Sequence, residues 1–294
     1  MRNSIILFLA IFSSIVSGKT RFPFFQIEFE YDEQDSWEGM CQIGTQQSPI
    51  DIPDDEYICD DTLVFDFTLL NETKPIIIED DGESFKAEYT DSKLYASDIN
   101  GILTAYQSLN FHFHSPSEHE IDGESYDLEL HFLHSITHNF LEKGLTKKLF
   151  AAVSIMFEVD DSADANPFIA ALNLTKLNTP LNLNVNSLLM SQLPSPIPFY
   201  TYQGSVTTPP CLEIVNWYIV TTPLKITRSQ LKVFKKRFSG NSTFADGDGN
   251  NRETQPVNGR TIKKGGVVCE EQFIYFFSFV IIFIVANYVV LKLL

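Results

Sequence analysis

The chain has 294 residues, of which 44% are hydrophobic, so it can bury the core of one large domain or of two small ones. Its formal net charge of −17 at pH 7 repels phosphate backbones and argues against a nucleic-acid-binding protein. The 25 phenylalanines and 11 tyrosines favour β-sheet. The four cysteines include no Cys-x-x-Cys pair, which argues against a zinc ribbon or a thioredoxin-like motif.

Residues 1–18 predict a signal peptide. Arg2 precedes a largely apolar run over 5–16, and the small residues Ser17 and Gly18 follow, which is the order of a secretory signal. The apolar run is too short to span a bilayer comfortably. We therefore expect cleavage near Gly18 and entry of the chain into the secretory pathway.

The stretch 19–265 predicts one mainly β domain with few, short helices. It contains no linker, repeat or low-complexity block, and Gly, Pro, Asn and Asp separate short apolar or alternating runs. In one predicted strand, Leu63, Phe65, Phe67 and Leu69 fall on one face. The other predicted strands cover residues 74–78, 109–114, 126–134 and 150–159. A short helix is expected over 167–177, and the Pro-rich stretch 193–198 is expected to be an ordered loop or a sheet edge.

All six histidines lie between His112 and His138. Residues two apart on a strand point to the same face, so His112 and His114 share one face of their predicted strand. Their neighbours Phe111 and Phe113 then point to the other face, into a core.

The next predicted strand carries His131, and the short loop centred on Gly123 favours antiparallel pairing of the two strands. Three imidazoles that converge from two strands leave one position of a tetrahedral zinc ion open, which is the layout of a catalytic site rather than a structural one. We expect His119, His134 and His138 to be ordinary hydrogen-bonded polar groups.

The C-terminal segment 273–292 predicts attachment to a membrane, because about 20 apolar residues suffice for a helix to cross the hydrocarbon layer. Two possibilities stay open: a single spanning helix, or a tail that is removed when a GPI lipid is attached, with Gly265 and Gly266 as small acceptor residues. Both put the domain on the extracytoplasmic face of a membrane, at the cell surface or in a lumen, where disulfides persist. The sequons at Asn71, Asn173 and Asn241 are candidate glycosylation sites that fit this compartment.

Short segments spread from about Tyr31 to Arg260 form one ordered set. They are Gln47-Ser48-Pro49-Ile50-Asp51-Ile52, Phe111-His112-Phe113-His114, Ser117-Glu118-His119, Glu129-Leu130-His131, Gly204-Ser205-Val206-Thr207-Thr208-Pro209-Pro210, Trp217, Asn251-Arg252, Gln255-Pro256 and Arg260. In order and spacing, the set resembles the α-class carbonic anhydrases, of the secreted or membrane-anchored type. The resemblance implies a large twisted, mostly antiparallel central sheet with short peripheral helices. It also implies reversible hydration of CO₂ to bicarbonate and a proton.

The resemblance assigns His112, His114 and His131 as ligands of Zn²⁺, with a water in the fourth position. Carbonic anhydrase is itself the reference case for such water, whose pKa falls to about 7, so that zinc-bound hydroxide attacks CO₂ at neutral pH. Glu129 and Asn110 would stand behind the ligands and fix the orientation of the imidazoles.

Thr207 and Glu118 are implied to act together. The hydroxyl of Thr207 can accept a hydrogen bond from the hydroxide only if it donates its own hydrogen bond to the carboxylate of Glu118. Thr208 would line the same pocket. The apolar wall for CO₂ is implied to consist of Leu133, Ala152, Val206 and Trp217.

Glu83 stands where fast members of the family carry a histidine that moves protons from the metal site to buffer. The unperturbed pKa of glutamate is about 4.3 and that of histidine about 6.5, so glutamate is the poorer relay at neutral pH. We therefore expect slower turnover, limited by proton release and dependent on buffer.

The resemblance implies a disulfide between Cys41 and Cys211, whereas the pairing of Cys59 and Cys269 stays open. A different function, a catalytically silent carbonic-anhydrase-like binding domain at a surface, is the alternative to the enzyme. The presence of all three ligand histidines favours the enzyme. A zinc esterase that acts on other carbonyl compounds would use the same hydroxide.

Overall fold

The computed structural model describes residues 29–53, 55–69, 75–90, 92–137, 148–238 and 249–269. The predicted signal peptide, the segment 273–292, the sequons at Asn71 and Asn241, and His138 lie outside these ranges. Within them, no helix has the length and the apolar character that a membrane crossing requires.

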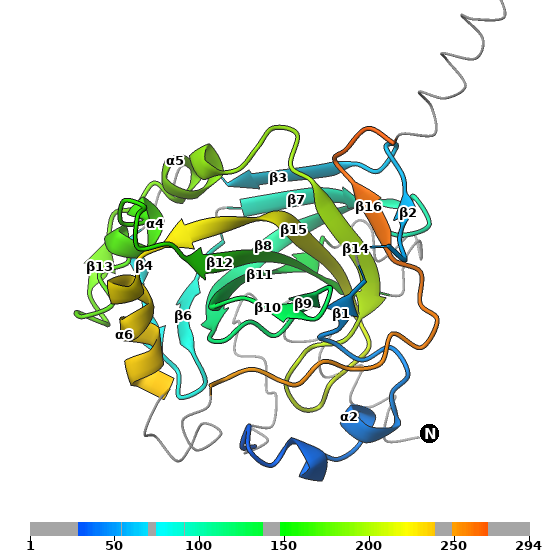
Figure 1. Ribbon diagram of the computed structural model, residues 1–294, viewed down its shortest axis with the longest axis horizontal. Helices are drawn as coiled ribbons and strands as arrows, with labels where there is room; N and C mark the ends of the chain where they lie inside the picture. The colour runs from blue at the N-terminus through cyan, green and yellow to red at the C-terminus, as the bar shows by residue number, and fades with distance from the viewer. Residues whose placement is uncertain are drawn as a thin grey trace, which may run out of the picture.

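One curled sheet of eleven strands organises the described part of the chain (Figure 1). Its main path runs through β2 (Ile58–Cys59), β16 (Lys263–Gly265), β14 (Phe199–Gly204), β15 (Val215–Ile226), β12 (Phe150–Val159), β11 (Leu128–Ile136), β8 (Leu103–His114), β6 (Phe85–Glu88) and β5 (Glu79–Asp80). A branch adds β7 (Ser92–Ser97) to β8 and β3 (Phe65–Leu69) to β7. Among the described strand pairs of this sheet, only β12–β15 and β16–β2 are parallel. The expected large, mostly antiparallel sheet is therefore confirmed.

Short elements surround this sheet. Two small sheets consist of β1 (Asp51–Ile52), β9 (Glu120–Ile121) and β10 (Glu124–Ser125), and of β4 (Ile76–Ile77) and β13 (Pro180–Leu181). The helices in the described ranges are η1 (Gln34–Ser36), α2 (Met40–Ile43), α4 (Pro167–Ala171), α5 (Val185–Leu189), η2 (Met190–Gln192) and α6 (Arg228–Phe238). Figure 1 shows α4, α5 and α6 along one margin of the sheet and α2 below it. The expected short peripheral helices are therefore confirmed.

The predicted helix over 167–177 is wrong in length. α4 begins where the side chain of Asn166 accepts hydrogen bonds from the backbone N–H groups of Phe168 and Ile169, and Pro167 occupies the first turn. It ends after Ala171, because Asn173 takes a left-handed conformation with φ of 49°. The longest helix in the described ranges, α6, was not predicted, although Leu231, Phe234 and Phe238 form a buried stripe on it.

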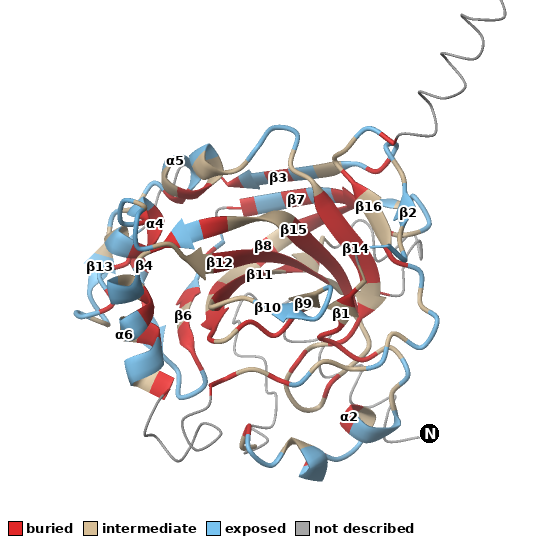
Figure 2. Ribbon diagram, in the orientation of Figure 1, coloured by how far each residue is buried: buried red, intermediate tan, exposed pale blue. Residues whose placement is uncertain are grey.

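The strands β8 and β11 carry different side chains on their two faces. Phe111, Phe113 and Phe132 are fully buried in the larger hydrophobic cluster, as the alternation of β8 predicts. On the other face, Trp217 and Tyr202 belong to a second, smaller cluster. Figure 2 shows that the buried residues concentrate in the long central strands. The histidines of β8 thus point away from the larger core, toward the side where Trp217 lies against the ring of His131.

Candidate metal centre and cavity

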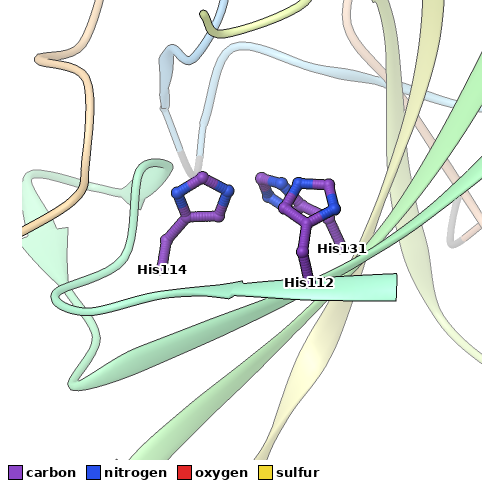
Figure 3. Close-up of side chains that lie close together, drawn as sticks. All are labelled: His112, His114 and His131. Carbon is purple, nitrogen blue, oxygen red and sulfur yellow. The ribbon is translucent and has the colours of Figure 1, made fainter. Parts of the chain in front are cut away.

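Three imidazoles meet above the central strands. In the antiparallel pairing of β8 with β11, His131 lies directly opposite His112, and His114 lies two residues farther along β8. The ring centroids are 5.1 Å apart for His112 and His114, 5.3 Å for His112 and His131, and 4.6 Å for His114 and His131. Figure 3 shows the three rings facing one another. One nitrogen from each ring lies within 4.8 Å of the other two, so the set can hold one metal ion.

Each imidazole has one ring nitrogen engaged by an acceptor. Nδ1 of His112 lies 3.0 Å from Oδ1 of Asn110, and Nδ1 of His114 lies 2.7 Å from the backbone oxygen of Asn250. Nε2 of His131 lies 2.6 Å from Oε1 of Glu129. A ring N–H donated to each acceptor leaves a lone pair on the opposite nitrogen, which is the form that binds metal.

The free nitrogens fit a zinc ion. Nε2 of His114 is buried and has no hydrogen-bond partner among the described residues, although buried polar atoms are rarely left unpaired. Burial lowers the pKa of His112 well below its ordinary value, and the neighbouring His114 and His131 lower it further. Burial also lowers the pKa of His114. Both rings are therefore kept neutral, as metal ligation requires.

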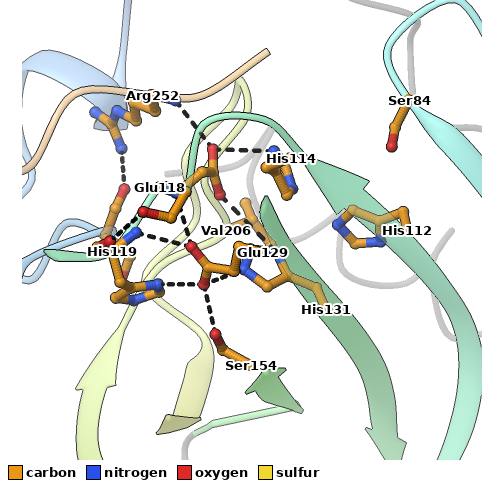
Figure 4. A network of polar contacts seen from close by, with 12 residues as sticks. Ser84, His112, His114, Glu118, His119, Glu129, His131, Ser154, Val206 and Arg252 are labelled. Carbon is orange, nitrogen blue, oxygen red and sulfur yellow. Dashed lines mark hydrogen bonds and ion pairs between the residues drawn. The ribbon is translucent and has the colours of Figure 1, made fainter. Parts of the chain in front are cut away.

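Glu129 is the centre of a buried network (Figure 4). Its Oε1 atom accepts hydrogen bonds from His131, from Nδ1 of His119 at 2.7 Å and from Oγ of Ser154 at 2.6 Å. Its Oε2 atom accepts the backbone N–H groups of Glu118 and His119 at 2.7 and 2.9 Å. Burial alone would raise the pKa of Glu129, but His119, His131 and their hydrogen bonds hold it well below its usual range. The carboxylate therefore stays ionised and holds His131.

His119 does more than the sequence predicted. Its Nδ1 holds Glu129, and its Nε2 lies 2.7 Å from the hydroxyl of Tyr202. His119, Glu129 and His131 also lie close enough together to hold an ion. Their facing atoms are already hydrogen-bonded to one another, however, and neither His119 nor Glu129 lines the cavity. The His112, His114 and His131 set is the better metal site for this reason.

Glu118 lies buried behind the histidines. One of its oxygens accepts the backbone N–H of Arg252 at 3.0 Å, and the same oxygen lies 3.5 Å from Nδ1 of His114. Burial raises the pKa of Glu118 to about 7, while the smaller effects of His131 and the side chain of Thr207 oppose that rise. The structure thus brings Glu118 beside Thr207, as the resemblance implied.

One cavity of about 160 Å³ connects the histidines to the surface. Its lining contains all the residues that the resemblance assigned to the substrate pocket, the metal ligands and Thr207, Asn110 and Glu83, whereas the buried carboxylates Glu118 and Glu129 do not line it. These lining residues are Glu83, Asn110, His112, His114, His131, Leu133, Ala152, Val206, Thr207, Thr208 and Trp217. The lining also includes Tyr31, Asp81, Ser84, Lys86 and Val215, which the sequence did not single out.

Charged residues also line the cavity and form what we call the charged rim. We define it as residues 81–86, which comprise the turn from β5 to β6 and the first two residues of β6. Oδ1 of Asp81 accepts the backbone N–H groups of Glu83 and Ser84, and Nζ of Lys86 lies 3.2 Å from Oδ2 of Asp81. Burial raises the pKa of Glu83, Asp81 raises it further, and Lys86 lowers it. Burial and Asp81 thus bring Glu83 nearer to a pKa that suits proton transfer than an exposed glutamate would be.

Two disulfides lie at different ends of the fold. Cys41, in α2, is bonded to Cys211, which directly follows Pro210, and their Cα atoms are 5.0 Å apart. This is the bridge that the resemblance implied. Cys59, in β2, is bonded to Cys269, with Cα atoms 5.7 Å apart. The second bridge answers the question of pairing that the sequence left open.

Asn173 lies exposed at the end of α4. Its Oδ1 accepts a hydrogen bond from the hydroxyl of Thr175 at 3.2 Å, within the same sequon. The position is accessible to modification from solvent.

The sequence profile of the eukaryotic-type carbonic anhydrases matches residues 32–265. The chain belongs to the carbonic anhydrase family. Among curated family members, it is 29% identical over 230 residues to the carbonic anhydrase of Nostoc sp., which covers 76% of this chain and 77% of that protein. A relative with another name, dioscorin DB3S of Dioscorea polystachya, is 27% identical over 281 residues, with 89% and 95% of the two chains covered.

Solved carbonic anhydrases have the same fold. Carbonic anhydrase Cah3 from Chlamydomonas reinhardtii, in complex with acetazolamide, aligns with a TM-score of 0.61 and 26% identity over 79% of this chain and 95% of that chain. The α-carbonic anhydrase from Thermovibrio ammonificans, in complex with sulfanilamide, aligns with a TM-score of 0.59 and 27% identity over 76% and 89%. The family and the fold thus support CO₂ hydration as the general activity.

Proposed function

We propose that this family member is an active, zinc-dependent carbonic anhydrase that converts CO₂ and water to bicarbonate and a proton. The observation that carries the proposal is the arrangement of His112, His114 and His131. Each ring has one nitrogen engaged by an acceptor, and the remaining nitrogens lie within reach of one ion at the base of a cavity. In the proposal, these three residues hold Zn²⁺.

When bound, zinc supplies a Lewis acid that makes a water molecule nucleophilic at neutral pH. The hydroxyl of Thr207 would donate a hydrogen bond to Glu118 and so turn an oxygen lone pair toward a water molecule in the cavity. Its position in the cavity lining, beside Glu118, supports this role.

The apolar wall and the charged rim have the remaining roles in the proposal. We assign Leu133, Ala152, Val206 and Trp217 to the apolar wall, which excludes water and accepts the small apolar substrate CO₂. Thr208 lines the cavity beside Thr207. Glu83, on the charged rim, takes the released proton toward buffer. A carboxylate at this position supports the expectation of slow, buffer-dependent turnover.

The proposal is tested on the purified full-length chain in detergent. We expect about one zinc per chain by metal analysis and CO₂ hydration by stopped-flow spectrometry. We also expect a sulfonamide such as acetazolamide to inhibit the reaction, because relatives are known in complexes with such compounds. A folded, zinc-loaded protein without hydration activity would refute the proposal.

A catalytically silent binding domain is the second candidate. The similarity to dioscorin, a relative that is not named a carbonic anhydrase, favours keeping it. The candidate predicts a folded protein that holds no stoichiometric zinc and hydrates no CO₂. The complete ligand set favours the enzyme.

We further propose that the domain over 19–265 lies on the extracytoplasmic side of a membrane, after removal of the signal peptide 1–18 and attachment through 273–292. The two disulfides support an oxidising compartment. Asn71, Asn173 and Asn241 are the proposed glycosylation sites, and a loss of mass on treatment with an N-glycosidase would test them.

A further inference from the structure

The last described residue, Cys269, is fixed to the edge of the main sheet. Strands β2 and β16 pair in parallel, with Cys59 opposite Lys264, and the disulfide then joins Cys59 to Cys269. Figure 1 shows β2 and β16 side by side at one margin of the molecule. The last described residue therefore lies at this margin.

This bridge bears on the two possible fates of the C-terminal segment. Attachment of a lipid to Gly265 or Gly266 would remove Cys269 and leave Cys59 without its partner. The two glycines also have a packing role. A Cβ atom on Gly265 would lie 2.6 Å from the ring of Phe199, and one on Gly266 would lie 1.9 Å from the backbone oxygen of Ile197. Their small size is required by the fold, so it is no evidence for lipid attachment.

The bridge also shortens the connection to the apolar segment. From Cys269 to Phe273 a fully extended chain reaches about 14 Å. Measured from Gly265, the end of β16, the same chain would reach about 28 Å. The headgroup layer on one side of a bilayer is roughly 5–8 Å thick. If 273–292 spans the bilayer, the disulfide holds this margin of the domain close to the headgroups.

The side chains at this margin suit a lipid interface. Ile58 is 55% exposed and Val268 is 69% exposed, although both are large and apolar. Nζ of Lys264 lies 4.7 Å from the centre of the Tyr57 ring, and tyrosine and lysine are typical residues of the membrane–water boundary. Asp55, Glu56 and Asp61 are exposed nearby in the sequence, and they disfavour an anionic surface.

We propose that this margin docks on the headgroup layer of a neutral phospholipid bilayer and that the Cys59–Cys269 disulfide holds it there. We call the surface formed by residues 57–59, 264 and 268–269 the docking corner. The short connection to the apolar segment selects a bilayer over a second copy of the chain as its occupant. The inference rests on the proposed membrane attachment and is independent of the proposed chemistry.

The test uses the full-length chain in phosphatidylcholine vesicles whose acyl chains carry bromine, which quenches tryptophan fluorescence at short range. Two matched variants, Ile58→Trp and Ile77→Trp, each replace an exposed isoleucine on a two-residue strand. Figure 1 shows β4, which contains Ile77, on the opposite side of the molecule from β2. Relative to the parent protein, the added fluorescence should be quenched severalfold more strongly at position 58 than at position 77.

A second variant separates the disulfide from the surface. Replacing both Cys59 and Cys269 by serine in the Ile58→Trp protein should reduce the quenching toward that of Ile77→Trp. Metal content and CO₂ hydration report folding and should not change, since the docking corner lies outside the cavity lining. Equal quenching at positions 58 and 77 would overturn the docking, and unchanged quenching without the cysteines would overturn the role of the disulfide.

Mass spectrometry of the unmodified protein gives an independent result. The inference requires a mature chain that retains the C-terminal segment and a disulfide-linked peptide that contains Cys59 and Cys269. A mature chain that ends at Gly265 or Gly266 with a lipid would overturn the inference without affecting the proposed chemistry. Quenching that depends on protein concentration rather than on brominated lipid would indicate a contact between copies and would also overturn it.

Discussion

The cavity has a charged rim and, formed by His112, His114 and His131, what we call the imidazole wall; the two differ in how their side chains are held. On the wall, His114 and His131 are nearly inaccessible to solvent, and fixed acceptors hold their rings. On the rim, the Lys86–Asp81 pair is partly exposed, and Glu83 is exposed and lines the cavity. The imidazole wall is thus held rigidly in the form that could bind a metal ion, whereas the rim contributes three charged side chains, Asp81, Glu83 and Lys86, that reach solvent. In the proposed function, metal retention would depend on the imidazole wall, and the rate would depend also on the rim.

The largest effect is expected from removing one ligand from the wall. His114→Ala takes away the nitrogen that is buried without a partner, and two ligands do not make a stable zinc site. Zinc content and CO₂ hydration should both fall to background, as measured by metal analysis and stopped-flow assays. Glu83→Gln, on the rim, is the matched control and should keep its zinc. Full metal content in His114→Ala would contradict the proposed ligand set.

His134 shows how burial affects a histidine that is not a proposed metal ligand. It is fully buried, its ring contacts the backbone oxygen of Phe132 and the hydroxyl of Ser92, and burial lowers its pKa to about 4. Between pH 6.5 and about 4 the unfolded chain binds the proton and the folded one does not, so stability falls as the pH falls. The loss should reach about 3 kcal/mol near pH 4.

Urea unfolding of the protein and of a His134→Gln variant at a series of pH values measures this loss. Glutamine keeps hydrogen-bonding capacity and does not titrate, so the difference between the two proteins isolates His134. The difference should change steadily below pH 6.5 and stay constant above it. A difference that does not vary with pH would show that His134 is not held neutral.

Glu129→Gln should weaken zinc binding about 10-fold to 100-fold, because the carboxylate fixes the orientation of His131. Competition with a chelator measures the affinity. Ser154→Ala removes only one of the hydrogen bonds to the same carboxylate and should have the smaller effect. If the two variants lose the same affinity, the charge of Glu129 is not what holds the ligand.

The smallest effect is expected on the rim. Glu83→His places a group with a pKa near 6.5 at the cavity lining and should raise turnover roughly tenfold at low buffer concentration. The rate of the unmodified protein should rise with imidazole concentration, and that of the variant should rise less. A high, buffer-independent rate in the unmodified protein would show that another route carries the proton.

The sequence predicted the convergence of the three histidines better than the contacts that surround them. The two-residue spacing of His112 and His114 determines their common face, and the loop at Gly123 makes His131 their neighbour. These relations are local. The support of His114 is not local, because its acceptor is the backbone oxygen of Asn250, 136 positions away. Every residue has such an oxygen, so no residue type signals this contact.

Other parts of the fold required the tertiary structure for the same reason. His119 has partners 10 and 83 positions away, and only the fold brings them together. The pairing of Cys59 with Cys269 depends on the parallel register of β2 and β16, for which the sequence gives no signal. The end of α4 was misplaced because a left-handed asparagine stops a helix whose apolar pattern continues.

Asn250 makes hydrogen bonds to both the imidazole wall and the charged rim. Its backbone oxygen receives the N–H of His114, and its side-chain amide donates to the backbone oxygens of Glu83, at 2.8 Å, and of Phe113, at 2.9 Å. If the rim were replaced by the corresponding loop of a faster relative, the new loop would have to keep the hydrogen bond to Asn250, because the same residue also fixes the ring of His114. The imidazole wall and the charged rim therefore cannot be exchanged independently, and a redesign of the rim must include Asn250.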